Sequence, residues 1–150
     1  MLEQQIEADI KTALLAGESQ RLVTLRGVKS ALLNLKVASG KRESGLSDDE
    51  VLQILSKESK KRQESADLYK QGGDAARTEA ELSEKAIIDA YLPAQLTEEE
   101  VAKLVDETIT ELGAEGKQAM GQVIGKVQAK SKGSADGAMI ARLTREKLGL

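Results

Sequence analysis

Lysines and glycines near the C-terminus have the types and spacing that an anion-binding site needs. The residues are Lys126, Lys130, Lys132, Gly133, Asp136 and Gly137. Helix N-termini present unpaired N–H groups to phosphate, and lysines in a basic segment attract it. Asp136 supports a competing interpretation, because its carboxylate could cap the helix that follows and leave the lysines as a rim around a capped turn. The sequence leaves both interpretations open.

Gly121 and Gly125 precede this turn and are four residues apart, so they share one face of a predicted helix. A glycine in a helix costs about 1 kcal/mol relative to alanine, which calls for a reason. Tight packing against another helix is one reason. Contact of the bare backbone with a partner or an RNA sugar is the other.

The chain offers little for catalysis. It contains no histidine and no cysteine, which removes the usual general base near neutral pH, thiolate chemistry and zinc sites. Serine and threonine are present without a nucleophile elbow, a Walker-type loop or a dinucleotide fingerprint. We therefore expect no active site, no cofactor and no metal.

Charge is distributed unevenly along the chain, whose formal net charge is −3. Residues 97–112 carry one basic and six acidic side chains, whereas residues 113–150 carry seven basic and three acidic ones. The basic tail could attract a polyanion, although a net-acidic chain is not a general nucleic-acid binder. Without a long apolar stretch or a basic start, the sequence predicts a cytoplasmic protein that does not enter a membrane.

The elements that must position these residues are predicted to be helices. Only two residues are aromatic, and no run has the alternation of a strand. Apolar residues with helical spacing predict helices at 2–16, 22–37, 47–71, 74–91 and 97–112, followed by a helix marked by Met120 to Val127 and another marked by Met139 to Leu148. In the fourth of these, the predicted buried face consists of Ala76, Ala80, Ile87 and Tyr91.

Short signals set the ends of these helices and divide the chain. Ser47 with Glu50 and Thr97 with Glu100 have the spacing of capping boxes. Pro93 stops a helix just before the second of these. The sequence therefore predicts an all-α protein with an N-terminal helical bundle at 1–92, which includes a long helical hairpin, and a small C-terminal three-helix domain at 97–150.

Two further basic clusters have both structural and functional interpretations. The first consists of Lys57, Lys60, Lys61 and Arg62, in a helix stretch without apolar residues. Arg62 lies about as far before the Gly72-Gly73 turn as Glu84 lies after it. At ~1.5 Å rise per residue an antiparallel hairpin brings the two together, with Glu81 one turn nearer. We favour this ion pairing over a phosphate-binding patch. A second set, Arg26, Lys29 and Lys36, borders an apolar face, and we favour salt bridging there over a binding surface.

Several motifs together resemble the GatB/YqeY-like family, in particular its stand-alone YqeY type. They are Lys61-Arg62-Gln63-Glu64-Ser65, Gly72-Gly73, Glu81 with Glu84, Tyr91-Leu92-Pro93-Ala94-Gln95-Leu96, Met120 to Val127 and Lys130 to Gly137. The last two resemble the tail of the B subunit of tRNA-dependent amidotransferase. The resemblance implies seven helices in two domains, a tail that helps to recognise tRNA, and an association with carbon–nitrogen ligase activity that uses glutamine as amido-N-donor.

These observations favour a non-catalytic adaptor that binds tRNA or a tRNA-handling enzyme through Gly121, Gly125 and the basic turn. One alternative is an accessory subunit that binds an amidotransferase-like enzyme by protein contacts. Another is a helical interaction module unrelated to RNA. The tail has no aromatic residue for stacking on single-stranded bases, which leaves shape and backbone contact as the RNA-binding mode.

Overall fold

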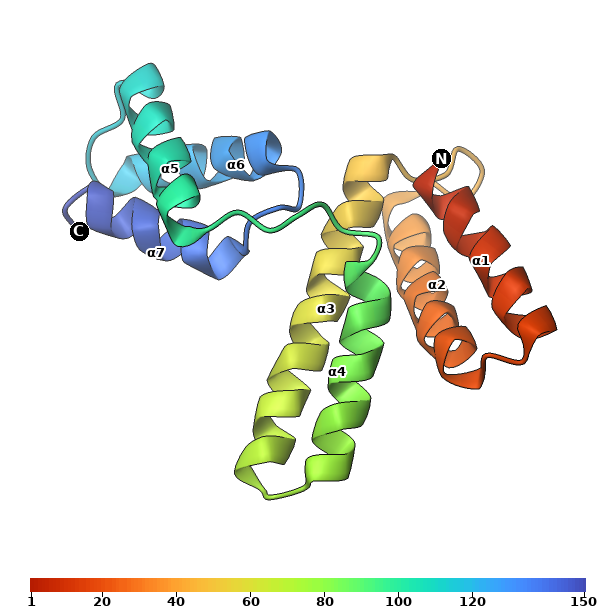
Figure 1. The fold of residues 1–150 in the computed structure, drawn as a ribbon. Coiled ribbons are helices and arrows are strands. Elements are labelled where there is room, and N and C mark those ends of the chain that lie inside the picture. The colour runs from red at the N-terminus through yellow and green to blue at the C-terminus, as the bar shows by residue number, and fades with distance from the viewer. The chain divides into compact units, whose positions relative to one another are not determined.

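The structure, a computed structural model, describes all 150 residues and is helical throughout (Figure 1). Its helices are α1 Leu2–Ala16, α2 Ser19–Ser39, α3 Asp48–Gln71, α4 Ala75–Asp89, α5 Glu98–Leu112, the 3-10 turn η1 Lys117–Ala119, α6 Met120–Ser131 and α7 Gly137–Lys147. The predicted all-α fold is confirmed. None of these helices has the length and apolar character needed to traverse a lipid bilayer.

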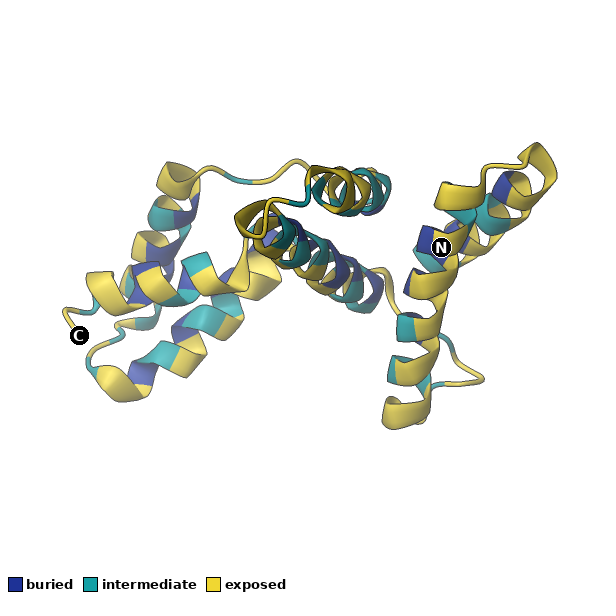
Figure 2. Ribbon diagram, turned by 90° about the horizontal axis from the view of Figure 1, so that it is seen from below, coloured by how far each residue is buried: buried dark blue, intermediate teal, exposed yellow.

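Contacts divide the chain into two compact units, an N-terminal unit, Met1–Leu92, and a C-terminal unit, Pro93–Leu150. Within each unit the buried residues recur along single faces of the helices (Figure 2).

Local side-chain chemistry starts and ends several helices. At α3 the Ser47 hydroxyl accepts a hydrogen bond from the Glu50 N–H, while the Glu50 carboxylate accepts one from the Ser47 N–H. Thr97 and Glu100 form the same reciprocal pair at α5. Both predicted capping boxes are confirmed. Gly113 ends α5 at a positive φ of 58°, where a side chain is strained.

The core of the N-terminal unit forms where α2 contacts α1, α3 and α4. Its fully buried aliphatic residues are Ile6, Val28, Leu32, Val51, Leu55 and Ile88. Tyr91 packs partly against this core and donates its hydroxyl to Asp9 at 2.5 Å, which ties the end of α4 to α1. Burial, and then the Asp9 carboxylate, raise the pKa of Tyr91 to about 12, so the hydroxyl stays protonated and keeps donating.

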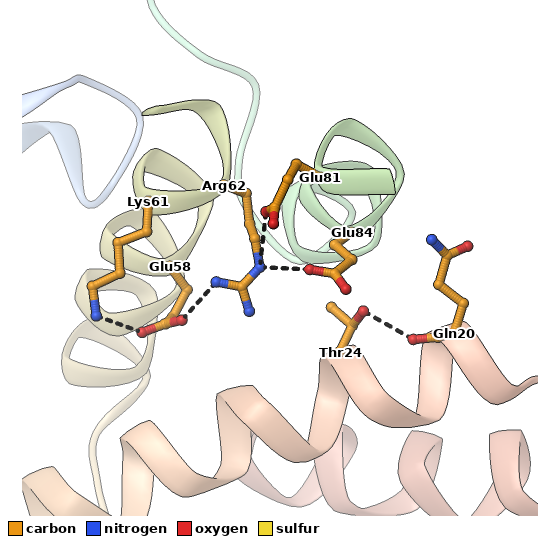
Figure 3. A network of polar contacts seen from close by, with 7 residues as sticks. All are labelled: Gln20, Thr24, Glu58, Lys61, Arg62, Glu81 and Glu84. Carbon is orange, nitrogen blue, oxygen red and sulfur yellow. Dashed lines mark hydrogen bonds and ion pairs between the residues drawn. The ribbon is translucent and has the colours of Figure 1, made fainter. Parts of the chain in front are cut away.

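The α3–α4 hairpin is held by polar contacts along much of its length. Arg62 Nε donates to Glu84 Oε2 at 2.9 Å and lies 3.9 Å from Glu81, while Arg62 Nη1 reaches the largely buried Glu58 at 3.4 Å (Figure 3). Nearer the base of the hairpin, Ser59 donates to Asp89. The predicted pairing of Arg62 with Glu81 and Glu84 is confirmed.

The predicted buried face of α4 is wrong for Ala76, Ala80 and Ile87, whereas Tyr91 packs partly against the core as predicted. Ala76 and Ala80 are exposed and Ile87 is half-buried, whereas Ile88 is completely buried. Glu81 and Glu84 of α4 face Arg62 of α3, so carboxylates occupy part of the inward side of α4. The spacing of apolar residues predicts the buried face of a helix only where that helix packs through apolar contacts.

The core of the C-terminal unit lies among α5, α6 and α7, each of which contacts the other two. Its buried aliphatic residues are Val101, Val105, Val123, Val127, Ile140 and Leu143. Two ion pairs link α7 to α5 at its surface, Arg142 with Glu98 and Lys147 with Asp106, each at 3.0 Å.

We predict measurable coupling between Arg62 and Glu84. A double-mutant cycle with Arg62→Ala and Glu84→Ala, followed by urea unfolding, should give a coupling free energy of a few tenths to about 1 kcal/mol, because both side chains are only partly exposed. The same cycle with Glu79, which is exposed, provides the control. Additive effects for Arg62 and Glu84 would contradict the pairing.

We also predict that the C-terminal unit folds alone. A fragment of residues 93–150 keeps the whole second core, so its circular dichroism should be helical and its thermal melt cooperative. The melt should lie below that of the full chain, since so short a chain buries proportionally little surface. A fragment without a cooperative transition, beside a full chain with a single one, indicates one continuous folding domain.

Candidate nucleic-acid interface

Helix α6 has a buried side and a bare side. Val123 and Val127 point into the core, whereas Gly121 and Gly125 lie exposed on another side of the helix. A Cβ atom built on either glycine meets no atom within 4 Å. The packing explanation for these glycines is therefore wrong, because no neighbouring helix comes close to them.

The C-terminal end of α6 leads into the predicted basic turn. Lys132 ends the helix with a positive φ of 46°, and its side chain is exposed. The carbonyl of Gly133 accepts a hydrogen bond from the Gln95 side chain at 3.2 Å, and the carbonyl of Ser134 accepts one from the Leu96 N–H at 2.7 Å. The segment that starts the C-terminal unit thus braces the turn.

Asp136 occupies the N-cap position of α7, but its side chain makes no capping hydrogen bond. The interpretation in which this carboxylate caps the helix is therefore wrong. Gly137 follows as the first residue of α7 and is exposed. A Cβ atom built on Gly137 would lie 3.5 Å from the side-chain amide nitrogen of Gln128. The N–H groups of this first turn are the candidate phosphate donors.

Lys126 and Lys130 are not a free rim around the turn, because both bind Glu111 at the end of α5. The Nζ–Oε distances are 3.0 Å for Lys126 and 2.7 Å for Lys130, and Lys130 also lies 3.3 Å from the hydroxyl of Thr108. Hydrogen bonds from Lys130 and then Lys126 lower the pKa of Glu111. Glu111 is thus fully ionised near neutral pH.

Glu111 belongs to this region, although no sequence motif points to it. The lysines lie on α6 and the carboxylate on α5, so only the packing of the two helices brings them together. The sequence contains part of the signal for this ion pairing. Lys126 and Lys130 are one helical turn apart, and an acidic helix precedes them.

Charge compensation extends over the whole C-terminal unit. It contains eight basic and nine acidic side chains, a formal charge of −1. The basic excess of residues 113–150 is therefore offset by α5, whose carboxylates pair with Lys126, Lys130, Arg142 and Lys147. Of the three predicted lysines, Lys126 and Lys130 thus pair with Glu111, whereas Lys132 is exposed.

The basic clusters of the N-terminal unit are largely engaged. Lys36 binds Glu3, Lys29 lies 3.4 Å from Glu7, and Lys61 lies 3.3 Å from Glu58. The predicted salt bridging is thus confirmed for Lys29 and Lys36, while Arg26 is exposed. A groove of about 50 Å³ between α1 and α2 is far smaller than a ligand pocket.

The structure is thus that of an all-helical protein whose C-terminal unit exposes a glycine-bearing helix face next to a basic turn. The family described as Yqey-like protein matches residues 3–148, and the chain belongs to this family. One subunit of the glutamyl-tRNA(Gln) amidotransferase of Thermococcus gammatolerans is 39% identical over 57 residues. That match covers 35% of this chain and 9% of the amidotransferase subunit, so about a third of the chain is similar to a small part of this relative.

Proposed function

We propose that the C-terminal unit binds tRNA and that the protein is a non-catalytic adaptor in tRNA-dependent amidotransferase systems. The observation that carries this proposal is the open space around Gly121 and Gly125. Two glycines in one exposed helix face lower the stability of α6 with no packing gain inside the protein. Close approach of a partner to the helix backbone supplies the missing reason.

RNA fits such a face through its shape. The minor groove of an RNA helix is wide and shallow and exposes 2′-hydroxyl groups, which a helix with two exposed glycines on one face can approach closely. Lys132 and the N–H groups at the start of α7 are suited to neighbouring phosphates. Both tyrosines of the chain belong to the N-terminal unit, so base stacking has no role in this binding mode.

The similarity to an amidotransferase subunit supports a context of tRNA-dependent carbon–nitrogen ligation. In this proposal the ligase chemistry, with glutamine as amido-N-donor, belongs to a partner enzyme in the cytoplasm, and this chain supplies contact with the tRNA. The second candidate is an accessory subunit that binds such an enzyme through protein contacts. This second candidate is favoured by the formal charge of −1 of the C-terminal unit, because a surface that binds a polyanion usually carries a net positive charge.

Alanine at the exposed glycines should have opposite effects on folding and on binding. Gly121→Ala and Gly125→Ala should each stabilise the protein by up to about 1 kcal/mol in urea unfolding, because the new methyl group meets nothing. Each should weaken tRNA binding, measured by fluorescence anisotropy, because the methyl group lies between the helix and the RNA.

Gly27→Ala is the matched control for this experiment. It places a methyl group in the middle of α2, at an ordinary 3.8 Å from the guanidinium of Arg62, and should leave tRNA binding unchanged. If the α6 variants are stabilised and still bind tRNA like the parent, the glycine face does not contact RNA.

The lysines should contribute the salt dependence of binding. Replacing Lys126, Lys130 and Lys132 by alanine should weaken tRNA binding and flatten the logarithmic salt slope, which should not exceed about three to four units for the parent. The control replaces Lys11, Lys57 and Lys70, which are residues of the N-terminal unit, by alanine and should change neither quantity. A parent protein that does not bind tRNA at low salt, yet retains an amidotransferase-like enzyme, favours the second candidate.

A further inference from the structure

We propose that Glu111 fills an anion subsite formed by Lys126 and Lys130, and that a phosphate of the bound nucleic acid takes its place. The inference rests on the proposed function, and it adds a residue that limits which anions can bind. It starts from the geometry at the surface between α5 and α6, where one carboxylate receives two ammonium groups.

The two lysines contact different oxygens of the same carboxylate. Lys126 Nζ lies 3.0 Å from Oε1 and Lys130 Nζ lies 2.7 Å from Oε2, with the Thr108 hydroxyl 3.3 Å from the second ammonium. A phosphate also presents several oxygens that accept hydrogen bonds from ammonium groups, and it has the same sign of charge. Lys126 and Lys130 are therefore arranged to bind an oxyanion, and in the free protein the Glu111 carboxylate is that anion.

Glu111 is not needed to hold α5 against α6. The two helices meet through Val101, Val105, Val123 and Val127, which are all completely buried. The Glu111 side chain is 50% exposed, and those of Lys126 and Lys130 are 37% and 32% exposed. Ion pairs at this exposure are weak and are screened by salt, so an incoming anion can displace the carboxylate.

Displacement makes binding selective. A small free anion that enters the subsite only exchanges the ion pairs of the two lysines with Glu111 for ion pairs with itself, so it gains little binding free energy. A ligand that also contacts the glycine face of α6 or Lys132 obtains additional interactions that no internal carboxylate supplies. Glu111 therefore lowers the attraction for unrelated polyanions and leaves affinity dependent on the shape of the ligand.

The test compares two variants of equal net charge, Glu111→Gln and Glu115→Gln. Glu115 lies in the loop after α5 and contacts neither lysine. In fluorescence anisotropy with a labelled tRNA transcript, Glu111→Gln should bind roughly threefold tighter or more than Glu115→Gln at low salt. Its logarithmic salt slope should be steeper by about one to two units, because two lysines become available to phosphates. Identical affinities and slopes for the two variants overturn the inference.

A heparin column tests the subsite without RNA. Glu111→Gln, and likewise Glu111→Ala, should elute at higher salt than Glu115→Gln, because two uncompensated lysines now face the sulfated polymer. Adding Lys126→Ala and Lys130→Ala to Glu111→Gln should abolish this delay. If the delay occurs while no variant binds tRNA, the subsite stands and the proposed tRNA function fails. If Glu111→Gln and Glu115→Gln elute together, the subsite is refuted whatever the tRNA result.

Discussion

The guanidinium of Arg62 links the two helices of the α3–α4 hairpin. It lies among carboxylates of its own helix and of α4, with Glu84 as the nearest at 2.9 Å, and it faces Gly27 of α2. A Cβ atom placed on Gly27 would lie 3.8 Å from this guanidinium, an ordinary contact distance. The hydrogen bonds of an arginine are directional, so Arg62 defines the register of α3 against α4. Apolar contacts between two helices are not directional and define their register less well.

The C-terminal unit uses ion pairs differently. Its helices are held by a small aliphatic core, and its surface charges are paired mostly between α5 and the two helices that follow. These pairs are exposed and contribute little to stability. Their main consequence is electrostatic, because they reduce a basic segment to a unit with almost no net charge. A nucleic-acid surface in such a unit depends on shape and on displaceable contacts more than on long-range attraction.

The exposed glycines of α6 provide a surface on which binding by shape is possible. Gly121 and Gly125 have no packing partner within 4 Å, which the proposed function explains by a partner that approaches the helix backbone. The neighbouring turn is braced by Gln95 and Leu96. In the proposed function, these hydrogen bonds reduce the ordering cost of binding at the turn. Membership in the Yqey-like family and partial similarity to an amidotransferase subunit are consistent with a partner among tRNA-handling molecules.

The sequence alone determined the helical fold and the capping boxes at Ser47 and Thr97, because each depends on residues within one or two helical turns. It also predicted the ion pair of Arg62 with Glu84, since the short turn between α3 and α4 allows only an antiparallel register. Only the tertiary structure decided which side of α4 is buried, that Gly121 and Gly125 face open space, and that Glu111 binds Lys126 and Lys130. These features depend on the rotation of one helix against another, which is set by the packing of the whole unit and not by local spacing.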